Sequence, residues 1–317
     1  MTKFAVTGAN GFVGRALCAE LIRRGHWVRA IVRTTNAPDF TCSEVVVVPD
    51  IGLDVDWEDA LQDIEIVIHL AARVHVMRED SLKPIDAFRQ VNVTGTECLA
   101  RAAARGGVRR FIYVSSIGVN GAETSLGRPF TEQDNVNPHS AYALSKWEAE
   151  QILLEIAEAS KLGVVILRPP LVYGRNAPGN FSLMLKSLAS GMPLPLASIK
   201  NLRSFIYIEN LVDALILCAL HKDAAGSIYL VSDSEEISTP DLLRLLGETM
   251  NFSVRLLPFP IGFLKFGGRL IGKTDQMARL VGSLRIDNGK IRRELNWKPP
   301  FTLVDGLSAS ASEITEN

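Results

Sequence analysis

The chain has 317 residues, 47% hydrophobic and 22% charged, so it is long enough to bury one large core, or one core and a smaller lobe. Its formal net charge of -1 argues against the strongly basic proteins that bind nucleic acid, and no basic stripe with interleaved aromatic residues occurs. The four cysteines lie far apart with no CxxC pair. This spacing predicts reduced, mostly buried thiols and no metal site.

The amino terminus and one apolar segment bear on export and on membrane spanning. Met1 runs directly into an apolar run, so we expect no secretory signal and a cytoplasmic protein. The segment from Leu256 to Ile271 is interrupted by two prolines, a lysine and an arginine, so we expect no membrane span. Packing within a smaller lobe is the favoured interpretation of this segment, and contact with a membrane surface is the alternative.

Short β-branched runs alternate with helical stretches through the first half of the chain. Helical spacing is seen at Val13, Leu17 and Leu21, and again across residues 87–104 and 143–156. Several runs are almost entirely apolar, which is typical of parallel strands buried on both faces. The alternation predicts an α/β fold with a Rossmann-type, doubly wound parallel sheet. The expected strands are Phe4–Thr7, Trp27–Val32, Val45–Val48, Ile64–Leu70, Phe111–Ser115 and Val164–Leu167.

The alternation loosens after Pro169 and Pro170, where Gly, Pro and Asn cluster. This change predicts a smaller carboxy-terminal lobe that closes over the carboxyl ends of the sheet and binds substrate. We expect residues 1–170 to form the sheet domain with 203–232 returning to it, residues 171–202 and 233–310 to form the lobe, and residues 311–317 to be a frayed tail.

A glycine-rich turn, TGANGFVG, follows the first expected strand and opens the first helix. Its glycines are Gly8, Gly11 and Gly14. A side chain at such a position would keep the backbone away from a pyrophosphate, which binds at the positive end of the helix. The spacing alone also fits an ordinary loop, but its place in a βαβ unit predicts a dinucleotide site.

A tyrosine and a lysine four residues apart, Tyr142 and Lys146, project from one face of an expected helix. An ammonium group beside a phenol favours the phenolate and lowers the pKa of the tyrosine, which could then exchange a proton with a carbinol or carbonyl. Ser115 and Ser116 end a strand upstream and could hydrogen-bond the same substrate oxygen. For YxxxK alone, a buried tyrosine with a solvated lysine is the better interpretation. Together with the glycine turn, the pattern favours catalysis.

These motifs resemble the extended short-chain dehydrogenases/reductases, particularly the branch of nucleotide-sugar 4-epimerases and 4-keto reductases. The resemblance covers nearly the whole chain. It is carried by TGANGFVG, by HLAA at 69–72, NVTGT at 92–96, YVSS at 113–116, YALSK at 142–146, RPPLVYG at 168–174, RSFIYIENLVDA at 203–214 and RRELNWKP at 292–299.

The resemblance implies roles for individual residues. Tyr142 would be the acid/base, Lys146 its partner and a ligand of the nicotinamide ribose, and Ser116 a donor to the substrate. Asn180 and Arg203 would hold the nucleotide's pyrophosphate, for which a guanidinium is suited; the alternative for Arg203 is a surface charge. The implied cofactor site comprises Gly8, Asn10, Gly11, Phe12, Val13, Gly14, Asp50, Ile51, Leu70, Ala71, Ala72, Asn92, Tyr142, Lys146 and Pro169.

Missing carboxylates narrow the chemistry within that branch. Sugar dehydratases of this kind carry an Asp-Glu pair after the catalytic hydroxyl, and related decarboxylases carry a Glu. This chain instead reads Ser116-Ile117-Gly118. What remains is net reduction of a keto sugar, or epimerisation through a transient ketone. A non-catalytic dinucleotide-binding protein is a remote alternative, because Tyr142, Lys146 and Ser116 are all present.

Arg33 bears on the cofactor, because it stands where an NAD-specific site usually places an acidic residue. An arginine there can pair with a 2′-phosphate, so NADP is favoured over NAD, although Arg33 could equally stack on the adenine. NADP favours a reductase of a UDP-4-keto-6-deoxy-N-acetylhexosamine for O-antigen-type surface polysaccharide synthesis. The alternative is a UDP-hexose or UDP-N-acetylhexosamine 4-epimerase with tightly bound NAD. UDP is favoured by resemblance alone, and a homodimer is expected because such dimers are common in the family.

Overall fold

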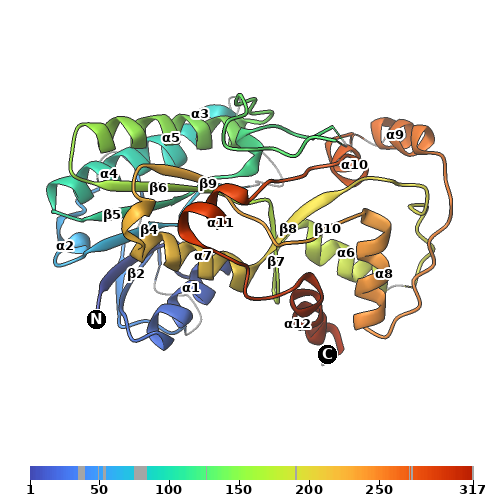
Figure 1. The fold of residues 1–317 in the computed structure, drawn as a ribbon, viewed down its shortest axis with the longest axis horizontal. Helices are drawn as coiled ribbons and strands as arrows, with labels where there is room; N and C mark the ends of the chain where they lie inside the picture. Colours follow the sequence, from blue (N-terminus) through green and yellow to red (C-terminus); the bar gives the residue numbers. More distant parts are fainter. Residues whose placement is uncertain are drawn as a thin grey trace.

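A seven-stranded parallel sheet forms the centre of the larger part of the computed structural model (Figure 1). Its strand order is β3-β2-β1-β4-β5-β6-β9. The strands are β1 Lys3–Thr7, β2 Trp27–Val32, β3 Glu44–Val47, β4 Ile66–His69, β5 Arg110–Val114, β6 Gly163–Arg168 and β9 Ser227–Leu230. The structure describes residues 1–34, 40–48, 50–52, 55–74, 84–125, 127–189, 191–270, 272 and 274–315. The predicted doubly wound parallel sheet is confirmed.

Helices cover both faces of this sheet, which explains why most residues of its central strands are apolar. Alternate residues of β1 point to opposite sides: Phe4 and Val6 join the core under one set of helices, and Ala5 joins the core under the other. The first set is α1 Phe12–Arg23 and α7 Ile208–Leu220, and the second is α2 Glu58–Leu61, α3 Pro84–Arg89, α4 Gly95–Arg105 and α5 Ala141–Glu158.

The remaining elements form a smaller lobe at one end of the sheet (Figure 1). A second sheet of order β10-β8-β7 lies there, built from Glu236–Ile237, Arg203–Tyr207 and Leu171–Tyr173. Its helices are α6 Asn180–Ala189, α8 Thr239–Thr249, α9 Ile261–Leu270, α10 Thr274–Val281 and α12 Leu303–Thr315, while α11 Gly289–Leu295 lies against β9.

Residues 203–232, expected to return to the sheet domain, divide between the two parts. Within that range β8 belongs to the small sheet, whereas α7 and β9 belong to the large one. At the carboxy terminus α12 continues to Thr315, so most of the segment expected to fray is helical, and Ala311 is buried.

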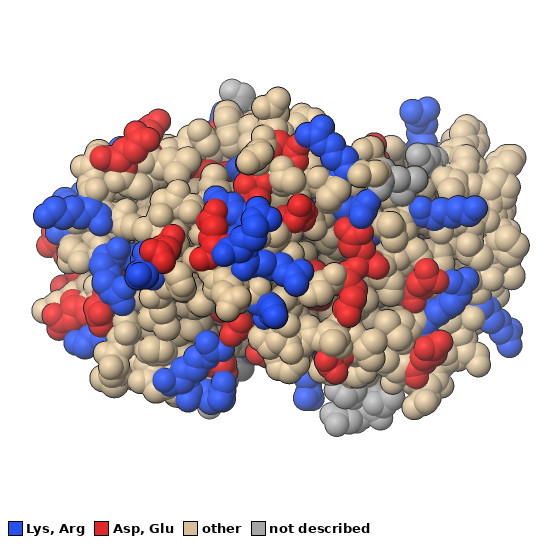
Figure 2. All heavy atoms as spheres, viewed as in Figure 1, with Lys and Arg blue, Asp and Glu red and all other residues tan. Residues whose placement is uncertain are grey.

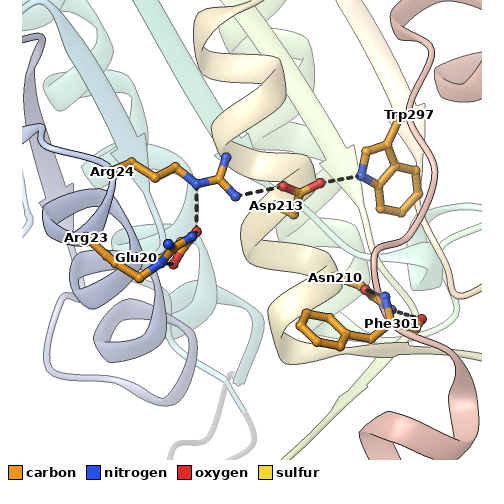
Figure 3. Close-up of polar contacts among 7 residues, drawn as sticks. All are labelled: Glu20, Arg23, Arg24, Asn210, Asp213, Trp297 and Phe301. Atoms are coloured by element: carbon orange, nitrogen blue, oxygen red, sulfur yellow. Dashed lines mark hydrogen bonds and ion pairs between the residues drawn. The ribbon is translucent and has the colours of Figure 1, made fainter.

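The carboxy-terminal segment is held against α7 by polar contacts (Figure 3). Asp213 accepts hydrogen bonds from Arg24 Nη2 at 2.8 Å and from Trp297 Nε1 at 3.1 Å. One turn earlier, the Asn210 amide pairs with both backbone groups of Phe301, each at 2.9 Å. These contacts join α1, α7 and the last segment of the chain across the boundary between sheet and lobe.

A membrane span and a metal site were both expected to be absent, and the structure bears on each for the residues that it describes. Among those residues no helix is long and apolar enough to cross a membrane, and no cluster of His, Cys, Asp or Glu could hold a metal ion. No disulfide joins the four cysteines, all of which lie in the described ranges; Cys18 and Cys218 are buried, and Cys42 and Cys98 are partly buried.

Candidate active site

The glycine turn has the geometry of a phosphate cradle. Gly8 has φ +66°, and a Cβ there would lie 2.9 Å from the Ala71 nitrogen. A Cβ on Gly14 would lie 2.3 Å from the Gly8 carbonyl oxygen, so the start of α1 can pack this closely only with glycine. Gly11 precedes α1 without a side-chain cap, and the following residues Phe12 and Val13 begin the helix. The first backbone N–H groups of a helix have no partners within it, so these residues fit a dinucleotide pyrophosphate.

The described residues that follow β2 and β3 lie at the carboxyl edge of the sheet, as the glycine turn does, where the adenine is expected. Arg33 is exposed directly after β2, and Asp50 is exposed with its Oδ1 accepting a hydrogen bond from the Ile51 nitrogen at 2.7 Å. Ile51 is buried, and its carbonyl oxygen would lie 2.1 Å from a Cβ on Gly95. A cavity of about 520 Å³ opens here, lined by Asp50, Gly52, Val55, Asp86, Arg89, Gln90 and Thr94.

Helix α5 brings Tyr142 and Lys146 to the carboxyl end of β5. Its first turn is capped by Ser140, whose Oγ accepts a hydrogen bond from the Ala143 nitrogen at 3.2 Å. Lys146 Nζ donates to the Val114 carbonyl at 2.8 Å and lies 6.0 Å from the centre of the Tyr142 ring. The lysine therefore ties α5 to the strand that leads into Ser116.

Ser116 lies beside the first turn of α5. Its Oγ accepts a hydrogen bond from the Gly118 nitrogen at 3.1 Å. A Cβ on Gly118 would be 3.3 Å from that Oγ, 3.4 Å from the Ala143 Cβ and 3.5 Å from the His139 ring, so these groups surround one point. A cavity of about 590 Å³ adjoins it, with Asn120 and His139 in its wall. Pro169 is buried after β6, and its carbonyl accepts from the Ile117 nitrogen at 3.0 Å.

Burial moves the pKa values of the tyrosine and the lysine in opposite directions. Removal from water raises the pKa of Tyr142 to about 12 and lowers that of Lys146 to about 7, while the carboxylate of Glu150 partly opposes the shift at Lys146. From the sequence alone, a lowered pKa of Tyr142 is expected. The structure differs because desolvation dominates and the ammonium is bonded to the Val114 carbonyl. Tyr142 is therefore a phenol at neutral pH, which suits it to donate a proton.

A buried chain of hydrogen bonds, which the sequence analysis missed, joins the cofactor turn to the middle of the sheet. The Ala71 nitrogen donates to Thr7 Oγ1 at 3.2 Å, and Thr7 Oγ1 lies 2.6 Å from His69 Nδ1. On its other side His69 Nε2 lies 3.0 Å from Thr96 Oγ1, which donates to the Asn92 carbonyl at 2.7 Å. Burial lowers the pKa of His69 to about 3, so the ring is neutral, and this pattern assigns its proton to Nε2.

Asn92 links that chain of hydrogen bonds to α5. Its side chain is buried, bonds both backbone groups of Arg73 and donates to Ser145 Oγ at 3.0 Å. Ser145 Oγ in turn donates to the Tyr142 carbonyl at 2.8 Å. Asn92 lies in a π-helical turn, Gln90–Thr94, a feature that often marks functional sites. The motifs HLAA and NVTGT predict Leu70, Ala71, Ala72 and Asn92 as site residues. The hydrogen bonds of His69 with Thr7 and Thr96 could not be predicted, because the fold brings these distant residues together.

The two residues predicted to hold substrate phosphates lie in the lobe. Arg203 begins β8, and its Nη1 donates to the carbonyls of Arg279 at 2.7 Å and Gly282 at 3.0 Å. Burial lowers the pKa of Arg203 to about 10, and the charge of Arg279 acts in the same direction. A second cation thus lies near the first. Asn180 begins α6, and its side chain lies outside the described part of the structure.

Comparison with known proteins places the chain among relatives of the same architecture. It is 40% identical over 314 residues to a UDP-glucose 4-epimerase of Vibrio cholerae, covering 98% of this chain and 95% of that protein. It is 30% identical to a 3 beta-hydroxysteroid dehydrogenase/Delta 5-->4-isomerase of Mycobacterium tuberculosis, covering 96% and 88%. The fold matches the UDP-glucose 4-epimerase of Thermotoga maritima solved with UDP-glucose, with a TM-score of 0.79, 21% identity and 99% of each chain covered.

A second solved structure of the same fold is the UDP-glucuronic acid 4-epimerase of Bacillus cereus in complex with NAD, with a TM-score of 0.78, 22% identity and 99% of each chain covered. The model of the NAD dependent epimerase/dehydratase family matches residues 4–232, from the first strand to just beyond β9. This chain belongs to the NAD dependent epimerase/dehydratase family.

Proposed function

We propose that this protein is a UDP-sugar 4-epimerase that uses NAD. The observation that carries the proposal is the grouping of Tyr142, Lys146 and Ser116 at the carboxyl end of β5, at the same edge of the parallel sheet as the uncapped amino terminus of α1. The identity of 40% to a UDP-glucose 4-epimerase along almost the whole chain supports the reaction. It favours the alternative that the sequence analysis ranked second.

For the proposed reaction, the chemistry that a bound nicotinamide dinucleotide would supply is reversible hydride transfer at C4 of the sugar. The amino terminus of α1 and the backbone of the glycine turn would hold the dinucleotide's pyrophosphate. Ser116 Oγ would donate a hydrogen bond to the oxygen on C4. Tyr142 would accept the proton of the C4 hydroxyl as C4 is oxidised and give it back to the ketone oxygen on reduction.

Lys146 would set the proton affinity of Tyr142 and help to hold the nicotinamide ribose. Its ammonium group is 6.0 Å from the tyrosine ring centre, near enough to favour a phenolate when it carries its charge. With a pKa of about 7, Lys146 is near half-protonated at neutral pH, and Glu150 favours the charged form. The pair can therefore serve both proton acceptance and proton donation.

The proposal of a nucleotide-sugar substrate depends on Arg203 in the lobe. A guanidinium in a partly dehydrated site suits a diphosphate, and the charge of Arg279 lies close to it. A steroid offers no such anion. Although a steroid dehydrogenase is among the relatives, these two cations favour a nucleoside diphosphate sugar over a neutral lipid substrate.

NAD is proposed in preference to NADP, which the sequence analysis favoured from Arg33. The family is described as NAD dependent, and solved structures of the same fold contain NAD. Arg33 is exposed beside the expected adenine end and would stack on the base in this interpretation.

A second candidate, reduction of a 4-keto nucleotide sugar, is favoured by one observation: Tyr142 is a phenol at neutral pH, which is the form that protonates a ketone. The absence of carboxylates after Ser116 fits both candidates. The two differ in whether the cofactor is consumed, and this difference can be measured directly.

The test offers UDP-glucose and UDP-N-acetylglucosamine to the protein without added cofactor, and a UDP-4-keto-6-deoxy-N-acetylhexosamine with NADPH or NADH. We expect interconversion of the gluco and galacto sugars by chromatography. Tyr142→Phe should lower the rate by about a hundredfold or more while dinucleotide affinity changes little. Oxidation of NADPH that requires the keto sugar, without interconversion, would instead establish the reductase and the NADP preference.

A further inference from the structure

Helix α9 turns an apolar face to solvent, contrary to the usual arrangement of a surface helix. Phe263, Phe266 and Leu270 are 66%, 60% and 72% exposed, and their i, i+3, i+7 spacing places them on one side. Leu264 and Gly268 are buried against the lobe. The exposed side therefore carries large apolar side chains where a surface helix usually carries polar ones.

The exposed apolar surface continues into the segment before the helix. Phe259 lies edge-to-face against Phe263 with ring centres 6.1 Å apart, and Leu257 is 52% exposed. Backbone hydrogen bonds of Leu257 with Leu194 and Ala197 fix this segment in the lobe. We call Leu257, Phe259, Phe263, Phe266 and Leu270 together the α9 face. Groups of exposed apolar side chains such as these are typical of interaction sites.

Cations accompany the α9 face in the sequence and on the surface. From Arg255 to Arg279 the chain also carries Lys265, Arg269 and Lys273, against the single acid Asp275. Arg269 is exposed between Phe266 and Leu270. In Figure 2 the end of the molecule around α9, at the upper right, is mostly uncharged, and the charged side chains among it are Lys or Arg. Apolar residues flanked by cations are the pattern of helices that lie in the surface of an anionic membrane.

We propose that the α9 face binds the surface of an anionic phospholipid bilayer, with α9 lying in the plane of the interface. The ten residues of α9 are too few to span a bilayer, so the contact is peripheral. Phe and Leu side chains would enter the headgroup region, and the neighbouring cations would contact lipid phosphates. Because the formal net charge is only -1, the attraction would come from cations near this face, such as the exposed Arg255 and Arg269, and not from the whole molecule.

The position of α9 relates this surface to the candidate active site. Helix α9 packs against α10, and the Arg279 carbonyl near the end of α10 accepts the hydrogen bond from Arg203. A molecule bound through the α9 face would hold its substrate lobe, rather than the sheet domain, next to the membrane. A second copy of the chain is the competing occupant, since an apolar face can also bind protein.

The experiment is sedimentation of the full-length protein with vesicles of phosphatidylcholine, alone or mixed in roughly equal parts with phosphatidylglycerol. The test variant is Phe263→Ser/Phe266→Ser/Leu270→Ser. Its matched control is Val45→Ser/Val304→Ser, which removes exposed apolar side chains at 48% and 51% exposure elsewhere on the molecule. Dinucleotide binding and thermal unfolding confirm that each variant is folded.

We expect the wild type and the control to bind the anionic vesicles, with binding reduced on neutral vesicles and at high salt. The triple variant should lose about tenfold or more of its membrane partition coefficient. Equal binding of wild type and triple variant, or no wild-type binding to anionic vesicles, would overturn the proposal. Conversion of a wild-type dimer to a monomer by the triple substitution, seen by light scattering without vesicle binding, would assign the face to a second copy and also overturn it.

Discussion

Gly95 allows α4 to pack closely against the loop proposed to hold the cofactor, because it has no side chain. It begins α4, directly after the π-helical turn, and faces the loop that carries Asp50 and Ile51. A Cβ there would lie 2.1 Å from the Ile51 carbonyl oxygen and 3.1 Å from its carbonyl carbon. Both are backbone atoms, so no side-chain rotation can relieve the contact. In Gly95→Ala the loop and α4 must therefore move apart.

The size of the effect follows from that distance. Restoring an ordinary contact needs a movement of about 1 Å at Ile51. Overpacking of this kind costs about 1–3 kcal/mol, and alanine returns about 1 kcal/mol through its higher helix propensity. The free energy of unfolding should fall by about 2 kcal/mol or less. A 1 Å displacement in a binding loop can weaken dinucleotide binding by about 10- to 100-fold, or about 1.4–2.8 kcal/mol.

Dinucleotide titration by fluorescence and thermal unfolding measure the two effects separately. The matched control is Gly267→Ala, also within a helix, where an added Cβ meets no atom within 4 Å. It should leave binding unchanged and raise stability by about 1 kcal/mol or less. If Gly95→Ala bound the dinucleotide within about twofold of the wild type, the assignment of this loop to the cofactor site would be refuted.

Two further predictions concern buried polar groups. Asn210→Ala removes the donor that is 2.7 Å from the Asp233 carboxylate and both hydrogen-bond partners of the Phe301 backbone. The free energy of unfolding, measured in urea, should therefore fall by about 2–4 kcal/mol. A fall of less than about 1 kcal/mol would contradict this prediction. Lys146 has a pKa of about 7 in the folded protein, well below its unfolded value, so the unfolded chain binds more protons between these values. The free energy of unfolding of the wild type, relative to Lys146→Met, should rise from about pH 7 to about pH 10, and a flat difference would contradict the burial of this amine.

The sheet could be predicted from the sequence because its strands carry their own signal. Residues 4–7, for example, are buried on both faces, so a nearly continuous apolar run marked β1 to within one residue. β5 was displaced by one residue, because Arg110 begins the strand although it is charged. Its stem is buried and its Nη1 reaches the Cys218 carbonyl at 3.4 Å, a contact that no local pattern reveals.

Residues of the candidate site could be predicted from the sequence only where they lie together in one short segment. Gly8, Gly11 and Gly14 fall within a single turn, and Tyr142 and Lys146 within one turn of helix. The partners that control their chemistry come from elsewhere in the chain: the Val114 carbonyl accepts a hydrogen bond from Lys146, and His69 joins β1 to α4. Burial, which sets both pKa values of the catalytic pair, likewise depends on the packed fold.

The protonation states of this pair bear on which reaction the site can perform. A reductase needs Tyr142 only as an acid, and a phenol with a pKa of about 12 meets that need. An epimerase must also remove a proton from the C4 hydroxyl, so the phenol must become a stronger acid before oxidation begins. The charged form of Lys146, favoured by Glu150, is the group on this chain placed to bring that about. Epimerisation therefore demands more of Lys146 than reduction does, because only epimerisation begins with Tyr142 removing a proton, whereas reduction begins from the phenol.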